Sequence, residues 1–267
     1  MIFDLNAWLG NLAFRQLTEN TPQGMLARMD RHGIQYAAVS SLEAMLHRNL
    51  QLANEKLAED VAPYGQRLFP LATINPTYVR WEDDLAYCHE KLGMRGVRLH
   101  PQYHGYTLAQ PIAKSVATAC RERNLPVFIA HRIEDSRQRH ALDPGKTVEF
   151  NEAAQLLTAV PGLRLVLTNA RGSIASSRLM QPDLINSSWF LDLSLAEVLF
   201  TRVLYDLAAK TGGQHLVFGT HAPISYAACA LVKLALLPLE NEQLELVKSG
   251  NASTIMGLLK DSGEQSA

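Results

Sequence analysis

Residues 3–10 read FDLNAWLG, a stretch in which apolar and polar side chains alternate. This period of two predicts a β-strand that begins almost at the first residue. On such a strand Asp4, Asn6 and Trp8 point to one side, and the residues between them point to the other. A buried strand with one polar side raises the question of what that side faces.

Seven more strand-like stretches follow, and amphipathic helical patterns separate them. The predicted strands span residues 2–9, 34–41, 67–75, 96–101, 125–132, 163–170, 188–195 and 215–222. The predicted helices span residues 21–33, 49–65, 79–93, 112–124, 150–162 and 201–213, and a last amphipathic stretch spans 240–259. Thr21 is the expected N-cap of the first helix, and Gly33 is its expected C-terminal stop.

Eight strands that alternate with helices predict an α/β fold, a single (β/α)8 TIM barrel over residues 1–267 with an extra C-terminal helix. The alternative is an open, doubly wound sheet. That class usually has a glycine-rich turn after its first strand, and no such turn follows residue 9. The number of strands therefore favours the barrel.

Composition excludes several classes of protein. The chain has 267 residues, 47% of them hydrophobic and 19% charged, with a formal net charge of -1. This near-neutral balance gives no reason to expect a nucleic acid or a membrane as partner. Three widely spaced cysteines and no Cys/His cluster indicate a reducing, cytoplasmic location. The longest apolar run, residues 224–239, is short and is interrupted by Lys233, so it does not predict a membrane span.

Polar side chains stand at nearly every predicted strand end. They are Asn6, Trp8, Ser40, Ser41, Asn75, Arg98, His100, His131, Arg132, Asn169, Asp192, Ser194 and His221. In a (β/α)8 barrel the functional groups gather at the carboxyl ends of the strands. Because buried polar groups cost free energy when they lack partners, so many of them predict a shared pocket.

Five motifs at these strand ends carry a family resemblance. They are DLNAWLG (4–10), GMRGVRLHP (93–101), VPGLRLVLTNARG (160–172), LVFGTHAPIS (216–225) and SGNASTIMGLL (249–259). Together they resemble the amidohydrolase-related branch of the metal-dependent (β/α)8 hydrolases, whose corresponding first-strand pattern is D-x-H-x-H-x-G. The motifs occur in the family's order and span the whole chain, so the resemblance implies a barrel hydrolase.

The chain departs from this family at the positions that hold metal. The resemblance implies two metal-binding histidines where the sequence has Asn6 and Trp8. It also implies a histidine at Asn169 and an aspartate at His221. An asparagine is a poor ligand for a transition metal, and a tryptophan is none. We therefore expect a degenerate metal site and no cofactor.

The first interpretation of the pocket is an altered amidohydrolase that acts on a small, anionic, carboxylate-bearing compound, by hydrolysis or by decarboxylation. Imidazoles titrate near neutral pH, guanidinium groups bind carboxylates, and amides polarise carbonyl groups. The predicted catalytic residues are His131, His221 and Asn169, and the predicted substrate-binding residues are Asn6, Trp8, Arg98, His100 and Arg132.

Two other interpretations stay open. His100, His131 and His221 are an acceptable ligand set for a divalent metal such as zinc. Alternatively, the barrel binds a small molecule without catalysis. The charged stretch HRIEDSRQRH (131–140) is either a solvated loop or a lid over the site. The sequence also leaves open the substrate and whether the chain forms a homo-oligomer.

Overall fold

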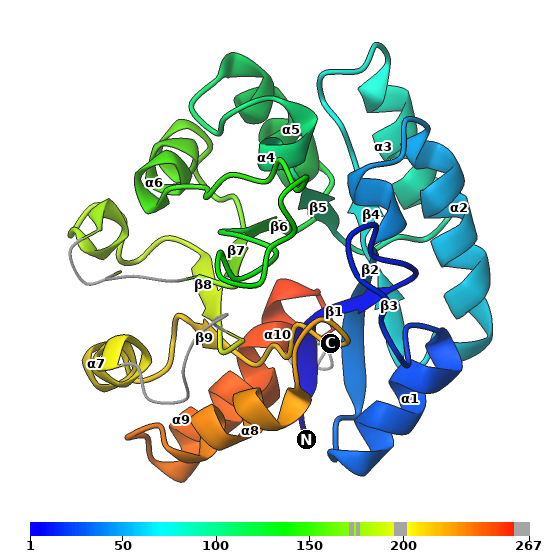
Figure 1. Cartoon of the computed structure of the whole chain (residues 1–267). Helices are drawn as coiled ribbons and strands as arrows, with labels where there is room; N and C mark the ends of the chain where they lie inside the picture. Colours follow the sequence, from blue (N-terminus) through cyan, green and yellow to red (C-terminus); the bar gives the residue numbers. More distant parts are fainter. Residues whose placement is uncertain (171–173, 175–176, 195–201, 259–267) are drawn as a thin grey trace, which may run out of the picture.

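The computed structural model describes residues 1–170, 174, 177–194 and 202–258. Helices surround a central set of parallel strands (Figure 1). The strands are β1 (Phe3–Leu9), β2 (Tyr36–Ser41), β3 (Leu68–Pro70), β4 (Ala72–Thr73), β5 (Val97–Leu99), β6 (Val127–Ala130), β7 (Leu165–Thr168), β8 (Trp189–Asp192) and β9 (Leu216–Val217).

The strands form a sheet in the order β1-β2-β3 and another in the order β4-β5-β6-β7-β8-β9. The segment after β9 lies alongside β1. There, the backbone N–H of Leu5 donates to the carbonyl of Phe218 (2.9 Å), and that of Trp8 donates to Ala222 (2.8 Å). The N–H of His221 donates in return to the carbonyl of Asn6 (2.7 Å). These bonds join the last strand to the first, as the predicted (β/α)8 barrel requires.

The predicted third strand, 67–75, occurs as two short strands separated by Leu71. The Leu71 N–H donates to Val39 in β2, whereas the Ala72 N–H donates to Gly96 beside β5. Pro70 has no N–H to donate, so the ladder is weakest at this point. The two sheets therefore meet within one continuous stretch of chain.

The outer layer follows the predicted helices closely. Its helices are α1 (Pro22–Arg31), α2 (Leu50–Val61), α3 (Trp81–Glu90), α4 (Pro101–His104), α5 (Pro111–Glu122), α6 (Phe150–Ala159), α7 (Arg202–Thr211), α8 (Ala227–Ala235), α9 (Asn241–Glu245) and α10 (Asn251–Ile255). The Thr21 side chain caps α1 by accepting from the Gly24 N–H (3.2 Å). The ends of the predicted strand 188–195, helix 201–213 and C-terminal stretch 240–259 reach outside the described residues.

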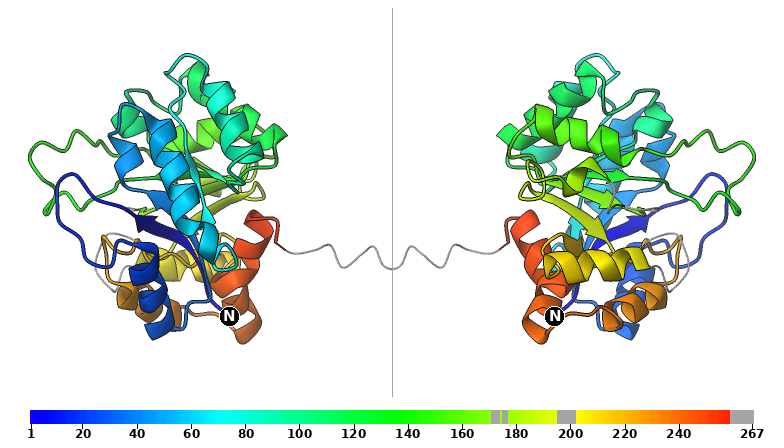
Figure 2. Two further views of the ribbon diagram at one scale, coloured as in Figure 1. Left: turned by 90° about the vertical axis from the view of Figure 1, so that its right-hand side faces the viewer. Right: turned by 90° about the vertical axis from the view of Figure 1, so that its left-hand side faces the viewer.

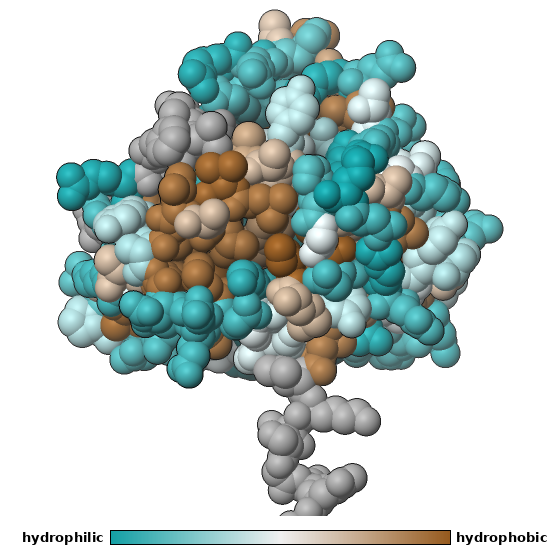
Figure 3. Space-filling view, turned by 90° about the horizontal axis from the view of Figure 1, so that it is seen from below, coloured by the Kyte–Doolittle hydropathy of each residue, from teal (hydrophilic) through white to brown (hydrophobic). Residues whose placement is uncertain are grey.

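Helix α8 was not predicted, because its residues are almost all apolar and show no clear period. Val232 on this helix and Leu236, its C-cap residue, are 42% and 49% exposed. Helix α8 lies at the bottom of the molecule in Figure 1, and apolar side chains gather on the face seen from below (Figure 3). No helix within the described ranges is long and apolar enough to cross a membrane.

The loops that carry the barrel mouth project from one side of the molecule. Residues 10–20 follow β1, and residues 131–149 connect β6 to α6. Both segments extend in the same direction (Figure 2). They contact each other, because Arg15 Nη2 lies 3.0 Å from Glu134 Oε1 and the ring of Phe14 stacks on His140. The strand ends therefore lie beneath two joined loops.

Candidate functional site

A buried polar network joins the carboxyl ends of β1, β7 and β8. The Asn6 Nδ2 group donates to Asp192 Oδ2 (2.7 Å) and to Asn169 Oδ1 (2.9 Å), and it lies 3.4 Å from Ser194 Oγ. Ser194 Oγ lies 2.6 Å from Asp192 Oδ2 and 2.7 Å from Asn169 Oδ1. Three oxygen atoms from two strand ends thus converge on one amide group of β1.

Arg98 on β5 determines how the Asn6 amide is oriented. Its Nη1 donates to Asn6 Oδ1 (3.2 Å), and its Nε donates to Ser40 Oγ (2.7 Å). Because a guanidinium has only donors, the amide oxygen of Asn6 must face Arg98 and its NH2 group must face Asp192. The guanidinium carbon also lies 4.2 Å from the ring centre of Trp8, a cation–π contact.

His221 is held as a neutral imidazole. Its Nδ1 accepts from Trp8 Nε1 (3.0 Å), so the proton resides on Nε2, which lies 2.8 Å from the carbonyl oxygen of Ile133. Burial, with a contribution from Arg98, lowers the pKa of His221 to about 3. His221 and Asn169 both have left-handed backbone conformations (φ 59° and 54°), which are uncommon for such residues and recur at functional sites.

Asp192 has the opposite shift. Burial raises its pKa to about 6, although it accepts hydrogen bonds from Ser194, Asn6 and the backbone N–H of Asn169 (2.9 Å). The Lys233 ammonium contributes a weaker, opposing effect. Lys233 is itself buried and donates to the backbone oxygen of Ser194 (2.7 Å). A carboxyl group with a pKa near neutrality can exchange a proton during catalysis.

The opposite side of the mouth contains polar groups without partners. His100 directly follows β5, is fully buried, and has no hydrogen-bond partner at either ring nitrogen among the described residues. The same holds for Nη2 of Arg98, two residues earlier. Burial lowers the pKa of His100 well below its usual value, with Arg98 contributing, so its ring is neutral. The ring lies 5.9 Å from that of Trp8.

Two predicted site residues lie apart from this network. His131 stacks on Phe150 of α6 (5.0 Å between ring centres), and its Nδ1 lies 2.7 Å from the carbonyl oxygen of Val148. Ala130 packs in the cluster of Trp8 instead, so strand alternation turns His131 away from the barrel interior. The backbone oxygen of Arg132 accepts from Asn169 Nδ2 (2.9 Å), and its guanidinium lies 3.9 Å from the Asp135 carboxylate.

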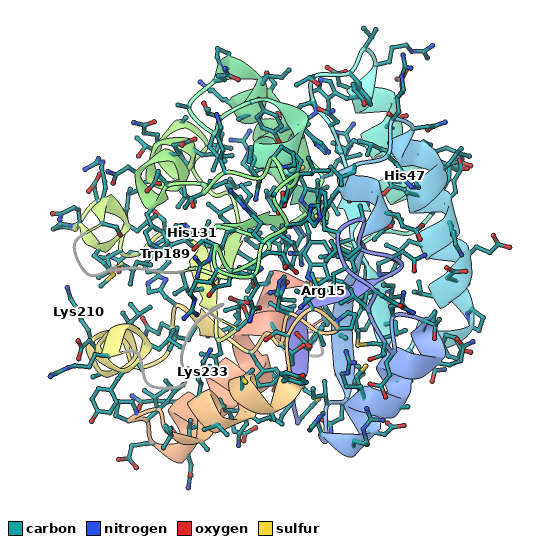
Figure 4. All side chains as sticks on the ribbon, viewed as in Figure 1. Arg15, His47, His131, Trp189, Lys210 and Lys233 are labelled. Carbon is teal, nitrogen blue, oxygen red and sulfur yellow. The ribbon has the colours of Figure 1, made fainter. Side chains whose placement is uncertain are left out.

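The structure therefore does not form the three-histidine metal site. His100 and His221 both lie against Trp8, but His131 faces α6. No group of three or more His, Cys, Asp or Glu side chains within the described ranges could hold a metal ion. Figure 4 labels His131, which directly follows β6. It also labels Arg15, in the loop after β1, and Lys233, on α8.

A groove of about 1080 Å³ leads to the edge of the network. Ser194 and Lys233 are among its lining residues, as is Gln138 of the β6–α6 loop. The charged side chains that line it among the described residues are four cations and one carboxylate: Arg15, Arg28, Arg31, Lys233 and Glu19. This charge distribution favours the approach of an anion.

Sequence reasoning placed Asp192 and Ser194 in the predicted pocket without assigning a role to either, and it did not select Lys233 for the site. A signal was available for two of them, because Asp192 and Ser194 share one face of a strand end. Roles were assigned instead to residues at positions that correspond to the family's metal ligands. Lys233 gave no signal, because a lysine inside an apolar helix is more often exposed than buried.

Comparison with known proteins identifies the family. The sequence model of the amidohydrolase family matches residues 9–258, and the chain belongs to that family. A search of curated proteins gave no match.

Solved structures share the fold. The 2,6-dihydroxybenzoate decarboxylase from Rhizobium has a TM-score of 0.73 and 14% identity, covering 96% of this chain and 98% of its own. The 5-carboxyvanillate decarboxylase from Sphingomonas paucimobilis gives 0.72 and 14%, with coverages of 96% and 98%. A dihydroxybenzoic acid decarboxylase from Polaromonas, solved with bound manganese and 2-nitroresorcinol, gives 0.72 and 15%, with coverages of 96% and 97%. At these identities the likeness shows the TIM-barrel fold alone.

The expectation of no cofactor was wrong. The Polaromonas enzyme has this fold and contains bound manganese, so substitutions at the first, sixth and eighth strands do not by themselves exclude a metal. The physical reason is that a metal site depends on the whole donor set, which four sequence positions do not define.

The donors that the structure describes do not fit a divalent ion. Asn169 Oδ1, Asp192 Oδ2 and Ser194 Oγ converge as oxygen ligands would, but the NH2 group of Asn6 lies among them. Arg98 prevents that amide from turning its oxygen toward them. One carboxylate beside a guanidinium also provides little negative charge for a cation.

Proposed function

We propose that this amidohydrolase-family chain is an enzyme that acts on a small carboxylate-bearing compound, by hydrolysis or by decarboxylation. The single observation that carries the proposal is Asp192, a fully buried carboxyl group with a pKa of about 6 at the carboxyl end of a barrel strand. Strongly shifted groups of this kind cluster at active sites, because catalysis requires a proton that can move near neutral pH.

Asp192 can serve either reaction. In decarboxylation the bond between the substrate carbon and its carboxylate breaks, carbon dioxide leaves, and the carbon takes a proton from the Asp192 carboxyl. Water then returns a proton to the carboxylate. In hydrolysis the ionised carboxylate takes a proton from the water that attacks the substrate carbonyl carbon, and it gives this proton to the leaving group when the bond between that group and the carbon breaks. Ser194 and Asn169 hold the group in place for both roles.

Arg98 and His100 are the proposed contacts for the substrate. The Nη2 group of Arg98 is a buried donor without a partner among the described residues, and an oxygen atom of an anionic substrate is a suitable acceptor for it. The neutral ring of His100, on the same side of β5, offers a further donor or acceptor. Leaving both groups unpaired costs free energy that a bound ligand would recover.

The experiment measures turnover of 2,6-dihydroxybenzoate and 5-carboxyvanillate, the substrates named for two structures of the same fold. Release of carbon dioxide separates decarboxylation from hydrolysis of an ester panel. Every assay is run with added manganese and with a chelator. Asp192→Asn is expected to lower kcat by about 10²–10⁴, the usual contribution of general acid–base catalysis.

Asp4→Asn is the matched control. Asp4 is also buried and accepts hydrogen bonds from Thr220 Oγ1 (2.5 Å) and the Asn6 backbone N–H (2.9 Å), but it lies deeper in the barrel. Equal loss of activity in both variants would show that Asp192 acts only through folding, and the proposal would be wrong.

The second candidate is a barrel that binds a small molecule without turnover. His221 favours it, because both of its ring nitrogens are engaged and burial keeps its pKa near 3, too low for proton exchange at neutral pH. Saturable binding of a carboxylate with no product in any assay would establish this candidate.

A further inference from the structure

Two loop carbonyls occupy a pair of hydrogen-bond donors inside the site. The Asn169 Nδ2 group donates to the backbone oxygen of Arg132 (2.9 Å), and His221 Nε2 lies 2.8 Å from the backbone oxygen of Ile133. These oxygens belong to consecutive residues of the β6–α6 loop. The two donor nitrogens lie 3.4 Å apart, close enough for one carboxylate to accept from both.

Both donors are fixed by other contacts. Asn169 Oδ1 accepts from Asn6 and Ser194, so its Nδ2 must face the loop. Trp8 donates to Nδ1 of His221, so Nε2 carries the proton. The donor pair is therefore preorganised, and it does not depend on the loop for its geometry.

The charge around the pair suits an anion better than a neutral carbonyl. Arg98 and Arg15 both contribute to lowering the pKa of His221, which places positive potential at its ring. Among the described residues that line the groove beside the loop, cations outnumber carboxylates. A positive potential stabilises the full negative charge of a carboxylate more than it stabilises the dipole of a neutral peptide carbonyl.

The β6–α6 loop has the properties of a segment that can move away from Asn169 and His221. Residues 131–149 contain no helix or strand, and loops of this length without secondary structure are usually functional. Residues 136–142 are exposed. Two contacts hold this loop against the loop after β1: the ion pair between Arg15 and Glu134 (3.0 Å) and the stacking of Phe14 on His140.

We propose that Asn169 Nδ2 and His221 Nε2 form a carboxylate-binding site that the β6–α6 loop fills with its own carbonyl oxygens in the absence of ligand. A ligand carboxylate displaces the Arg132 and Ile133 oxygens, and the loop opens toward the groove. The inference rests on the proposed function for the class of ligand, but not for turnover.

Hydrogen–deuterium exchange over residues 131–149 tests the displacement. The probe is 2,6-dihydroxybenzoate, and resorcinol, the same ring without the carboxylate, is its matched control. The carboxylate is expected to raise exchange in this loop about tenfold, and resorcinol is expected to leave it unchanged. A loop whose exchange is unchanged or slowed at saturating 2,6-dihydroxybenzoate, or a chain that does not bind it, would overturn the inference.

Glu134→Gln provides a second, independent measurement. Loss of the Arg15 ion pair destabilises the closed conformation of the loop, so opening the loop costs less free energy. The carboxylate is therefore expected to bind several-fold more tightly. Glu149→Gln is the control, because Glu149 is exposed at the far end of the same loop. Unchanged or weaker binding by Glu134→Gln would count against displacement.

The two proposals fail separately. Turnover with an unchanged loop would overturn the carboxylate site at Asn169 and His221, and the proposed enzyme would stand. Loop release without any turnover would support the site and favour the binding barrel.

Discussion

The two sides of the barrel mouth are equally polar but differ in how their hydrogen bonds are made. On the side of β1, β7 and β8, the side chains of Asn6, Asn169 and Asp192 satisfy one another. On the side of β5, His100 and one nitrogen of Arg98 have no partner among the described residues. A satisfied network specifies one arrangement, whereas unpaired buried groups indicate where a ligand binds. The comparison predicts that substitutions of equally buried polar residues on the two sides will change the free energy of unfolding by different amounts.

The largest effect is expected for Arg98→Met. It removes the buried cation that faces Asn6 and stacks on Trp8, and it leaves Asp192 without that compensation. Breaking a buried charge arrangement costs about 3–5 kcal/mol of unfolding free energy. Urea denaturation at pH 7 measures it. Arg178→Met, at an exposed ion pair with Asp183, should change stability by less than about 1 kcal/mol. If the two variants lost similar amounts of unfolding free energy, the buried network would stabilise the fold no more than an exposed ion pair does.

The next effect is a pH dependence of His221→Gln. Glutamine keeps an acceptor for Trp8 and a donor for the loop but does not titrate. Because the folded pKa of His221 is about 3 and its usual value is 6.5, only the unfolded chain gains this proton as the pH falls below 6.5. The wild type should therefore lose about 2 kcal/mol relative to the variant between pH 7.5 and pH 5.

Asp192 has a raised pKa and shifts stability in the opposite direction between about pH 4 and 6, but it does so in both proteins and cancels in the difference. His47→Gln, at an exposed position marked in Figure 4, is the control and should parallel the wild type. Parallel curves for His221→Gln as well would mean that the imidazole is accessible to protons in the folded state.

The smallest effect has the opposite sign. His100→Leu removes a buried ring that makes no hydrogen bond to the described part of the chain, so it should raise the unfolding free energy by about 1 kcal/mol. The matched variant is His215→Leu, whose ring is also buried beside a tryptophan. Its nitrogens lie 2.7 Å from the carbonyl oxygens of Trp189 and Ile185. That variant should be destabilised, and loss of stability in both would contradict the assignment of His100 to ligand binding.

Much of the fold follows from local patterns in the sequence. The period of two marked the first strand, and Thr21 and Gly33 marked the first helix correctly, because each signal is short-range. The division of the third strand at Leu71 could not be predicted, since it depends on which neighbour each residue pairs with. Helix α8 was missed because an apolar run has no period to detect.

The site was predictable where strand alternation holds. Asn6 and Trp8 share one side, as do Arg98 and His100, and all four are buried at the mouth. His131 was selected as a histidine at a strand end, whereas Ala130 is the residue that points inward at the end of β6. The role of the Arg132 and Ile133 carbonyls is carried by backbone atoms, which have no signature in side-chain chemistry.

The contact between Trp8 and its neighbours gives the molecule an optical reporter. The indole donates to His221 and lies under the guanidinium of Arg98, so its excited state experiences both groups directly. The other two tryptophans, Trp81 and Trp189, belong to α3 and β8. Any event that moves charge or water to the mouth should change the emission of Trp8 in particular. The intrinsic fluorescence of the unlabelled chain can thus follow the arrival of a ligand in real time.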